Sequence, residues 1–316
     1  MSEVDLALFR EYPGPIEWNV PMLLNNDRVA RDIDTVIETF FGVKAFTNIY
    51  GGFTSPWSGG RGSVYGGALE EGCVPSVGVF SARGIMSWLT FSRMELTDEQ
   101  LNDERMWKIV SWLLPYKWGA IVTDDRLCDR LKEFNQNIPV KASVVKFQKA
   151  FLEDRFGSIE EEAVLYQRTL EKYDYIVARP EFIIKGGYNL IPEELRPRVE
   201  VLVNQYCVAN CPRAIEHYKS IENFELTGEW NDFACIQRQN FMDCLNSCNI
   251  DYDTVCSLVK LGYKRFKIQG RGMSPRCVMQ QLGEYIFEPS GFFHVLSEYI
   301  AQQVKFDQMM GKEARF

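Results

Sequence analysis

The chain has 316 residues, of which 46% are hydrophobic and 25% are charged, and it carries nine cysteines and a net charge of −8. These values exclude a disordered or collagen-like chain, and the acidic balance disfavours a protein that binds nucleic acid through bulk electrostatics. No apolar run reaches the roughly 18 residues of a membrane helix, and Met1–Arg10 lacks the basic start of a signal peptide. We therefore expect a cytoplasmic protein whose cysteines are not paired in disulfides.

Short apolar runs, typical of buried strands, alternate along the chain with amphipathic stretches, typical of helices. The predicted strands are Trp18–Leu24, Lys44–Tyr50, Ser76–Phe80, Gly119–Thr123, Val140–Val145, Tyr175–Ala178, Val199–Tyr206 and Arg265–Gln269. The predicted helices are Asn26–Phe41, one that begins at Thr97 as its N-cap, Asp124–Phe134, Ile159–Tyr173, Pro212–Ile221, Asp251–Leu261, Ser274–Ile286 and residues 291–310. The loop Gly52–Gly72 is too long for a simple turn and is a candidate binding loop.

Eight strands that are mostly followed by helices fit one closed, TIM-like β/α barrel over residues 1–316, with an irregular cysteine-containing insertion at 222–250 and a C-terminal helix. Continuously apolar strand cores such as Ala120–Val122 and Val201–Val203 indicate strands that are covered on both faces. A doubly wound open sheet is the alternative. Such a sheet normally carries a glycine-rich phosphate-binding turn after its first strand, and Leu24–Asp27 is not one.

Catalytic groups of β/α barrels lie at the C-terminal ends of the strands. The predicted strand ends carry a polar set: Tyr50–Gly52, Thr123–Asp125, Lys141 with Ser143, Arg179–Glu181, Asn204 with Tyr206 and Cys207, and Gln269–Gly272.

The cysteines indicate a metal site. Cys207 and Cys211 form a C-x3-C pair where an apolar strand meets a helix, and a helix N-terminus stabilises a thiolate. Thiolates bind zinc or iron–sulfur clusters, usually four to a site. We predict that Cys207, Cys211 and Cys235 are ligands and that the fourth is Cys277, with the other two candidates being Cys244 and Cys248. Cys73, Cys128 and Cys256 are expected to be ordinary core residues.

Three further residues are candidates for the site. His217 lies on the same predicted helix as Arg213 and could act as an acid or base, although an ordinary helix histidine is an equal alternative. Arg61 and Arg271 each lie between glycines and suit a carboxylate or phosphate; the alternative is a surface turn. The G-x-S-x-G, H-E-x-x-H and P-loop motifs are absent.

Two segments resemble the collagenase-like peptidase family. Val203–Arg213, continuing to His217 and Tyr218, is similar to the family's VNxxCxxxCPxRxxHY segment, and Gly262–Arg271 is similar to its GxxxFKIxGR segment. Weaker similarities lie at Val20 and Pro21, Asn25–Asp27 and Lys141–Ser143.

The family includes proteins first called peptidases, and relatives that modify RNA bases or hydroxylate the ubiquinone ring without oxygen, several with a [4Fe–4S] cluster on four cysteines. The resemblance thus implies a barrel-like fold and cluster ligation by Cys207, Cys211 and Cys235. The chain departs from the family where relatives have an IRPED-like stretch, because Asn249–Asp253 stands there with extra cysteines nearby.

We expect an iron–sulfur enzyme that hydroxylates or otherwise modifies an aromatic ring or nucleobase. Arg179, Arg271 and Arg61 would bind an anionic co-substrate, and Glu181 or His217 would move protons. The expected substrate is a small anionic or aromatic molecule, or a base of RNA or DNA, and no membrane partner is expected.

Two alternatives stay open. A peptidase-type hydrolase is one, although no nucleophile–base pair is recognisable. The other is a non-catalytic barrel, stapled by zinc, that assembles with a protein partner or with itself through its C-terminal helix and Phe292 and Phe293.

Overall fold

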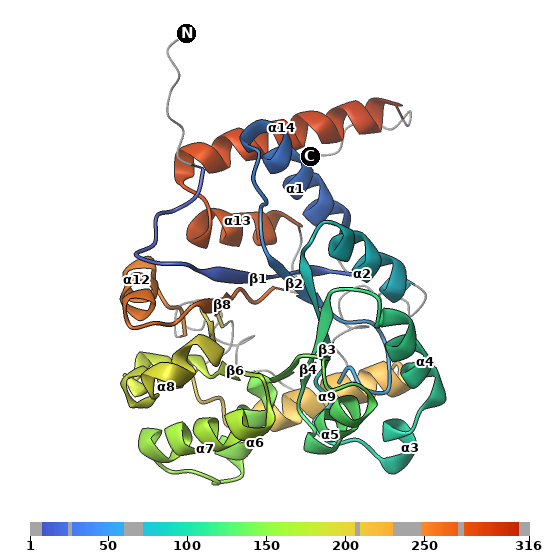
Figure 1. Cartoon of the computed structure of the whole chain (residues 1–316), viewed down its shortest axis with the longest axis vertical. Coiled ribbons are helices and arrows are strands. Elements are labelled where there is room, and N and C mark those ends of the chain that lie inside the picture. Colours follow the sequence, from blue (N-terminus) through green and yellow to red (C-terminus); the bar gives the residue numbers. More distant parts are fainter. Residues whose placement is uncertain are drawn as a thin grey trace.

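The computed structural model describes residues 8–24, 27–59, 72–205, 209–229, 248–270 and 275–309. It contains a closed barrel of eight parallel strands in chain order, in which β8 pairs with β1 (Figure 1). The strands are β1 (Glu17–Leu23), β2 (Asn48–Gly51), β3 (Met86–Phe91), β4 (Trp118–Val122), β5 (Val140–Ala142), β6 (Tyr175–Ala178), β7 (Val199–Leu202) and β8 (Arg265–Lys267). The predicted TIM-like barrel is confirmed.

Helices connect the strands and surround the barrel (Figure 1). They are α1 (Asp27–Phe41), α2 (Cys73–Ala82), α3 (Asp98–Leu101), α4 (Glu104–Leu113), α5 (Asp125–Phe134), α6 (Val144–Leu152), α7 (Ile159–Lys172), α8 (Pro180–Ile184), α9 (Ala214–Thr227), α12 (Tyr252–Lys260), α13 (Pro275–Tyr285) and α14 (Pro289–Met309), with 3-10 helices at Gly187–Leu190 and Glu193–Arg198. Thr97 is an N-cap as predicted, and it forms a capping box with Gln100.

Several predicted elements differ from the structure in type or in extent. Ser76–Phe80 is not a strand but part of α2, and the third strand is β3; a short apolar run does not distinguish a buried helix from a strand. The strand predicted over Val140–Val145 ends at Ala142, because Ser143 caps α6 by accepting a hydrogen bond from the Val145 amide. The helix predicted to end at Ile221 continues to Thr227, so the first residues of the predicted insertion belong to α9; residues 230–247 lie outside the described residues.

Apolar side chains fill the layer between the strands and the helices, as expected for strands covered on both faces. The packing at the β1–β2 contact is close enough to require glycine. A Cβ atom at Gly51 would lie 1.9 Å from the Leu23 carbonyl oxygen, where the register between these strands shifts. In the described part of the chain, no helix is long and apolar enough to cross a bilayer.

The carboxyl ends of the strands form the mouth of the barrel, and α9 crosses it. The helix follows β7, yet its Glu222 accepts a hydrogen bond from the Met94 amide and its Glu225 accepts one from the Ser58 hydroxyl. Met94 follows β3 and Ser58 follows β2. Asn210, before α9, contacts Glu181 at the end of β6, and α9 packs against α6, so the helix crosses the mouth along its β6-to-β3 side.

Candidate functional site

Two of the predicted catalytic residues lie together at the end of β6. Arg179 is the N-cap of α8 and Glu181 lies in its first turn, and their residues are only 1% and 4% exposed. Both contact Asn210, in the segment that leads from β7 to α9. Asn210 donates its amide to Glu181 Oε1 at 2.8 Å, and its Oδ1 accepts from Arg179 Nη2 at 2.5 Å.

The surroundings of Arg179 are acidic and aromatic. Its guanidinium lies 3.7 Å from Glu162 Oε1 and 3.6 Å from Glu181 Oε2. The Phe151 ring covers one side of the guanidinium, 4.1 Å from ring centroid to Cζ. Burial raises the pKa of Glu162 above its ordinary value, and the Tyr166 hydroxyl donates to Glu162 at 2.6 Å. Two carboxyl groups, those of Glu162 and Glu181, thus lie beside a single buried arginine.

Three of the cysteines lie next to the chain that follows β7, either in sequence or through a contact. Cys211 is half-buried and directly follows Asn210. Cys248 is buried, and Gln205 Nε2 lies 3.9 Å from its sulfur. Cys277 is exposed in the first turn of α13, one turn before Gln281, whose Oε1 accepts from Asn204 Nδ2 at 2.7 Å.

Several predicted site residues cannot be placed. Cys207, Cys235, Cys244, Arg61 and Arg271 lie outside the described residues. Among the residues that the structure describes, no group of three His, Cys, Asp or Glu side chains is arranged to hold a metal ion. The predicted ligand set of Cys207, Cys211, Cys235 and Cys277 thus stays a prediction.

The remaining described cysteines agree with a structural role. Cys73 and Cys128 are fully buried, and burial raises the pKa of the Cys128 thiol to about 12, which makes it unreactive near neutral pH. Cys256 is half-buried on α12. 

The two histidines lie in different places. His217 is half-buried in the first half of α9, with its ring stacked on that of Tyr218 at 6.1 Å, so it belongs to the helix that crosses the mouth. His294 is on α14 and packs edge-on against Phe40 and Phe41.

Charged side chains also occupy the interior of the barrel. Lys141 of β5 forms an ion pair with Glu200 of β7, and its Nζ lies 4.0 Å from the Trp88 ring centroid on β3. Because β3, β5 and β7 are not neighbours, these side chains meet inside the barrel. Lys267 Nζ lies 3.9 Å above the Tyr50 ring.

The electrostatics of this interior favour the ionised carboxylate. Burial alone would raise the pKa of Glu200, but the charges of Lys141 and Lys267 hold it below its ordinary value. Burial lowers the pKa of Lys141. Asn19 donates to both Glu200 oxygens, at 3.2 and 3.3 Å.

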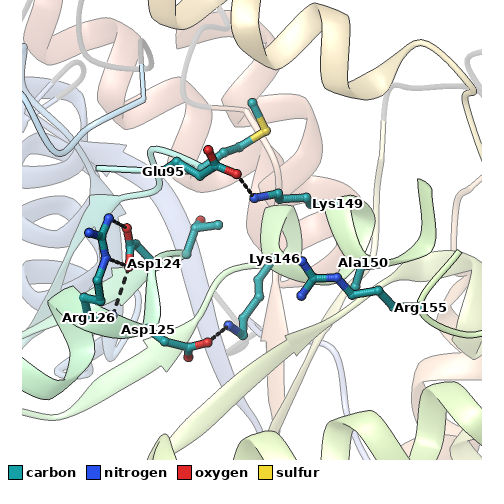
Figure 2. A pocket seen from close by; sticks show the side chains of 10 residues that line it. Glu95, Asp124, Asp125, Arg126, Lys146, Lys149, Ala150 and Arg155 are labelled. Carbon is teal, nitrogen blue, oxygen red and sulfur yellow. Dashed lines mark hydrogen bonds and ion pairs between the residues drawn. The ribbon is translucent and has the colours of Figure 1, made fainter. Parts of the chain in front are cut away.

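A pocket of about 250 Å³ opens at the ends of β3, β4 and β5 (Figure 2). Lys149 and Lys146, one turn apart on α6, point to opposite walls, where they form ion pairs with Glu95 and Asp125. Arg126 forms an ion pair with Asp124, beside Asp125. The hydrogen bond from Lys149 lowers the pKa of Glu95. The lining is Met94, Glu95, Thr123, Asp124, Asp125, Arg126, Lys146, Lys149, Ala150 and Arg155.

The sequence indicated only part of this pocket. Thr123–Asp125 stands at a predicted strand end. Lys146 and Lys149 do not, because they follow the predicted strand Val140–Val145 in a stretch where no helix is predicted and the structure has α6. The i, i+3 spacing of the two lysines after Ser143 is the signal that could have located them on one helix face.

Comparison with known proteins supports the architecture. No family model and no curated protein sequence matches the chain. The solved structure of the U32 peptidase Mk0906 is similar, with a TM-score of 0.52 and 14% sequence identity over 83% of this chain and 95% of that chain. At this identity the likeness shows a shared barrel fold, and function must be argued from the site.

Proposed function

We propose that the chain is an enzyme that works at the mouth of the barrel and modifies an aromatic ring or nucleobase with the help of a cysteine-ligated iron–sulfur cluster. The observation that carries this proposal is that Cys211, Cys248 and a residue one turn after Cys277 each adjoin or contact the chain that follows β7: Cys211 comes directly after Asn210, Cys248 lies near Gln205, and Gln281 accepts from Asn204. Cysteine thiolates are the ligands of such clusters, so the donors fit this group.

In this proposal Cys207, Cys211 and Cys235 are three ligands, and the fourth is Cys277, Cys248 or Cys244. A bound cluster would supply redox or Lewis-acid chemistry. His217 on α9 would accept or donate a proton, and Arg271 would bind an anionic group of the co-substrate.

The pocket of Figure 2 is a second place for an anionic group at the mouth. Lys146 and Lys149 have side chains that are 19% and 17% exposed, whereas their partners Asp125 and Glu95 are 52% and 78% exposed. An exposed carboxylate is a weak competitor for these lysines because exposed ion pairs contribute little to stability. A phosphate or carboxylate of the co-substrate would therefore displace Glu95 from Lys149.

Anaerobic reconstitution with iron and sulfide tests the proposal. Cys211→Ser should lose most bound iron, and Cys128→Ser, a buried cysteine on α5, serves as the matched control and should keep it. Separate Cys248→Ser and Cys277→Ser variants identify the fourth ligand. Equal loss in Cys211→Ser and Cys128→Ser would contradict the ligand assignment.

A peptidase-type hydrolase is the second candidate, favoured by the barrel that the chain shares with the U32 peptidase Mk0906. Cleavage of a peptide pool by the iron-free chain, abolished by one substitution at the mouth, would support it over the iron–sulfur enzyme. A colourless chain that holds zinc and cleaves nothing would support the zinc-stapled partner.

A further inference from the structure

The backbone at Asn210 requires support. Its φ is +51°, in the left-handed region that residues other than glycine adopt at a cost, although asparagine tolerates it better than most. Asn210 lies directly before Cys211 and three residues after Cys207. The conformation of this one residue therefore sets the direction in which the Cys211 side chain leaves the chain.

Two hydrogen bonds hold Asn210 in this conformation. Glu181 accepts from its backbone amide at 2.8 Å, and Arg179 donates to its side chain at 2.5 Å. Both partners belong to the junction of β6 and α8, where Pro180 fixes the first helical position. The segment after β7 is thus attached to a rigid part of the neighbouring strand.

Arg179 is enclosed by the protein, and its Nε and Nη1 atoms have no hydrogen-bond partner among the described residues. It is 1% exposed, with Phe151 over its guanidinium at 4.1 Å and Phe156 at 5.6 Å. Its contacts with Glu162 and Glu181, at 3.7 and 3.6 Å, are longer than hydrogen bonds. The short contact that its side chain makes in the described structure is the one with Asn210.

We propose that Arg179 and Glu181 form a positioning clamp that fixes Asn210 and thereby orients Cys211. The purpose of the clamp, to hold thiols for a cluster, rests on the proposed function, whereas the clamp itself does not.

Site-resolved alkylation of the purified full chain tests the clamp. The rate of iodoacetamide labelling at Cys211 is followed by peptide mass spectrometry, with the exposed Cys277 as the internal reference. Glu181→Ala should raise the Cys211 rate about tenfold, since it removes a charge-assisted hydrogen bond and lets the segment open. Glu181→Gln, which keeps an oxygen acceptor, should restore most of the protection. Asn210→Gly, which keeps the left-handed conformation but loses the Arg179 contact, should give an intermediate rate.

Asp34→Ala is the matched control. Asp34 is 1% exposed, accepts from the Ala45 amide at 3.0 Å and pairs with Arg83. Like Glu181→Ala, this substitution removes a buried carboxylate that accepts from a backbone amide, but the carboxylate is on α1. The clamp predicts an unchanged Cys211 rate in Asp34→Ala. An unchanged rate in Glu181→Ala, or an equal rise in both variants, would overturn the clamp.

The iron content separates the clamp from the proposed function. If the wild-type chain binds iron, Glu181→Ala should weaken its iron affinity about tenfold, as the loss of an outer-shell contact typically does. If the wild-type chain binds no iron, the proposed function fails, and the labelling rates still decide whether the clamp exists.

Discussion

The charged interior of the barrel predicts an unequal response to two substitutions. Glu200 balances two lysines: it forms an ion pair with Lys141, and the charge of Lys267 also lowers its pKa. Glu200→Gln would leave both ammonium groups buried without their carboxylate. Lys141→Met would leave Glu200 with Lys267 and Asn19, and place an apolar side chain against the Trp88 ring.

Removal of one partner from a buried ion pair costs about 3–5 kcal/mol. With an unfolding entropy of about 2 cal/mol/K per residue and 316 residues, Glu200→Gln should lower the melting temperature by roughly 5–8 °C. Lys141→Met should lower it by less than about half of this amount, because Glu200 keeps the charge of Lys267 and the hydrogen bonds from Asn19, so no buried charge is left unbalanced.

The ion pair of Glu200 also makes the stability of the barrel depend on pH. The folded pKa of Glu200 lies below its ordinary value of 4.5, so its contribution to stability is present above that value and is lost as the pH falls through the folded pKa. Circular dichroism melts at neutral and acid pH measure both effects. Equal losses of melting temperature in Lys141→Met and Glu200→Gln would refute the reasoning that one carboxylate serves two lysines.

Other parts of the chain give further predictions. Gly51→Ala should destabilise the barrel by more than about 3 kcal/mol in urea titration, because the new Cβ would collide with the Leu23 carbonyl; a smaller loss would mean that the two strands separate easily. Burial raises the pKa of Asp27 from 3.8 to about 6, so the folded chain loses stability as the pH rises through this interval. Asp27→Asn should remove that loss and add about 2 kcal/mol at pH 7, and an unchanged pH profile would contradict it. Lys149→Gln should reduce the rise in melting temperature that phosphate gives the wild-type chain, whereas Lys108→Gln, at an exposed lysine, should not. Equal rises in the wild-type chain and both variants would exclude the pocket as an anion site.

The barrel could be predicted because each strand keeps its own apolar run and most are followed by a helical pattern. Tyr175–Ala178 is a strand within the predicted bounds, and the N-cap at Thr97 is confirmed. The error at Ser76–Phe80 has a physical cause: α2 is almost uniformly apolar, so it lacks the one-sided pattern that identifies a helix.

The site was less accessible to sequence reasoning because it depends on contacts between segments that are distant in the chain. Arg179 and Glu181 could be predicted to lie at the mouth because they follow a strand end. Their contact with Asn210 could not, because it depends on the path that the chain takes after β7. The same holds for Lys141 and Glu200, which lie 59 positions apart and meet only because the barrel closes. 

The iron and acid-labile sulfide content of the wild-type chain, purified without oxygen, decides whether the chain holds a cluster. A chain with one [4Fe–4S] cluster should be brown and contain about four iron and four sulfide. A colourless chain that contains neither iron nor sulfide after anaerobic reconstitution would contradict the proposed function.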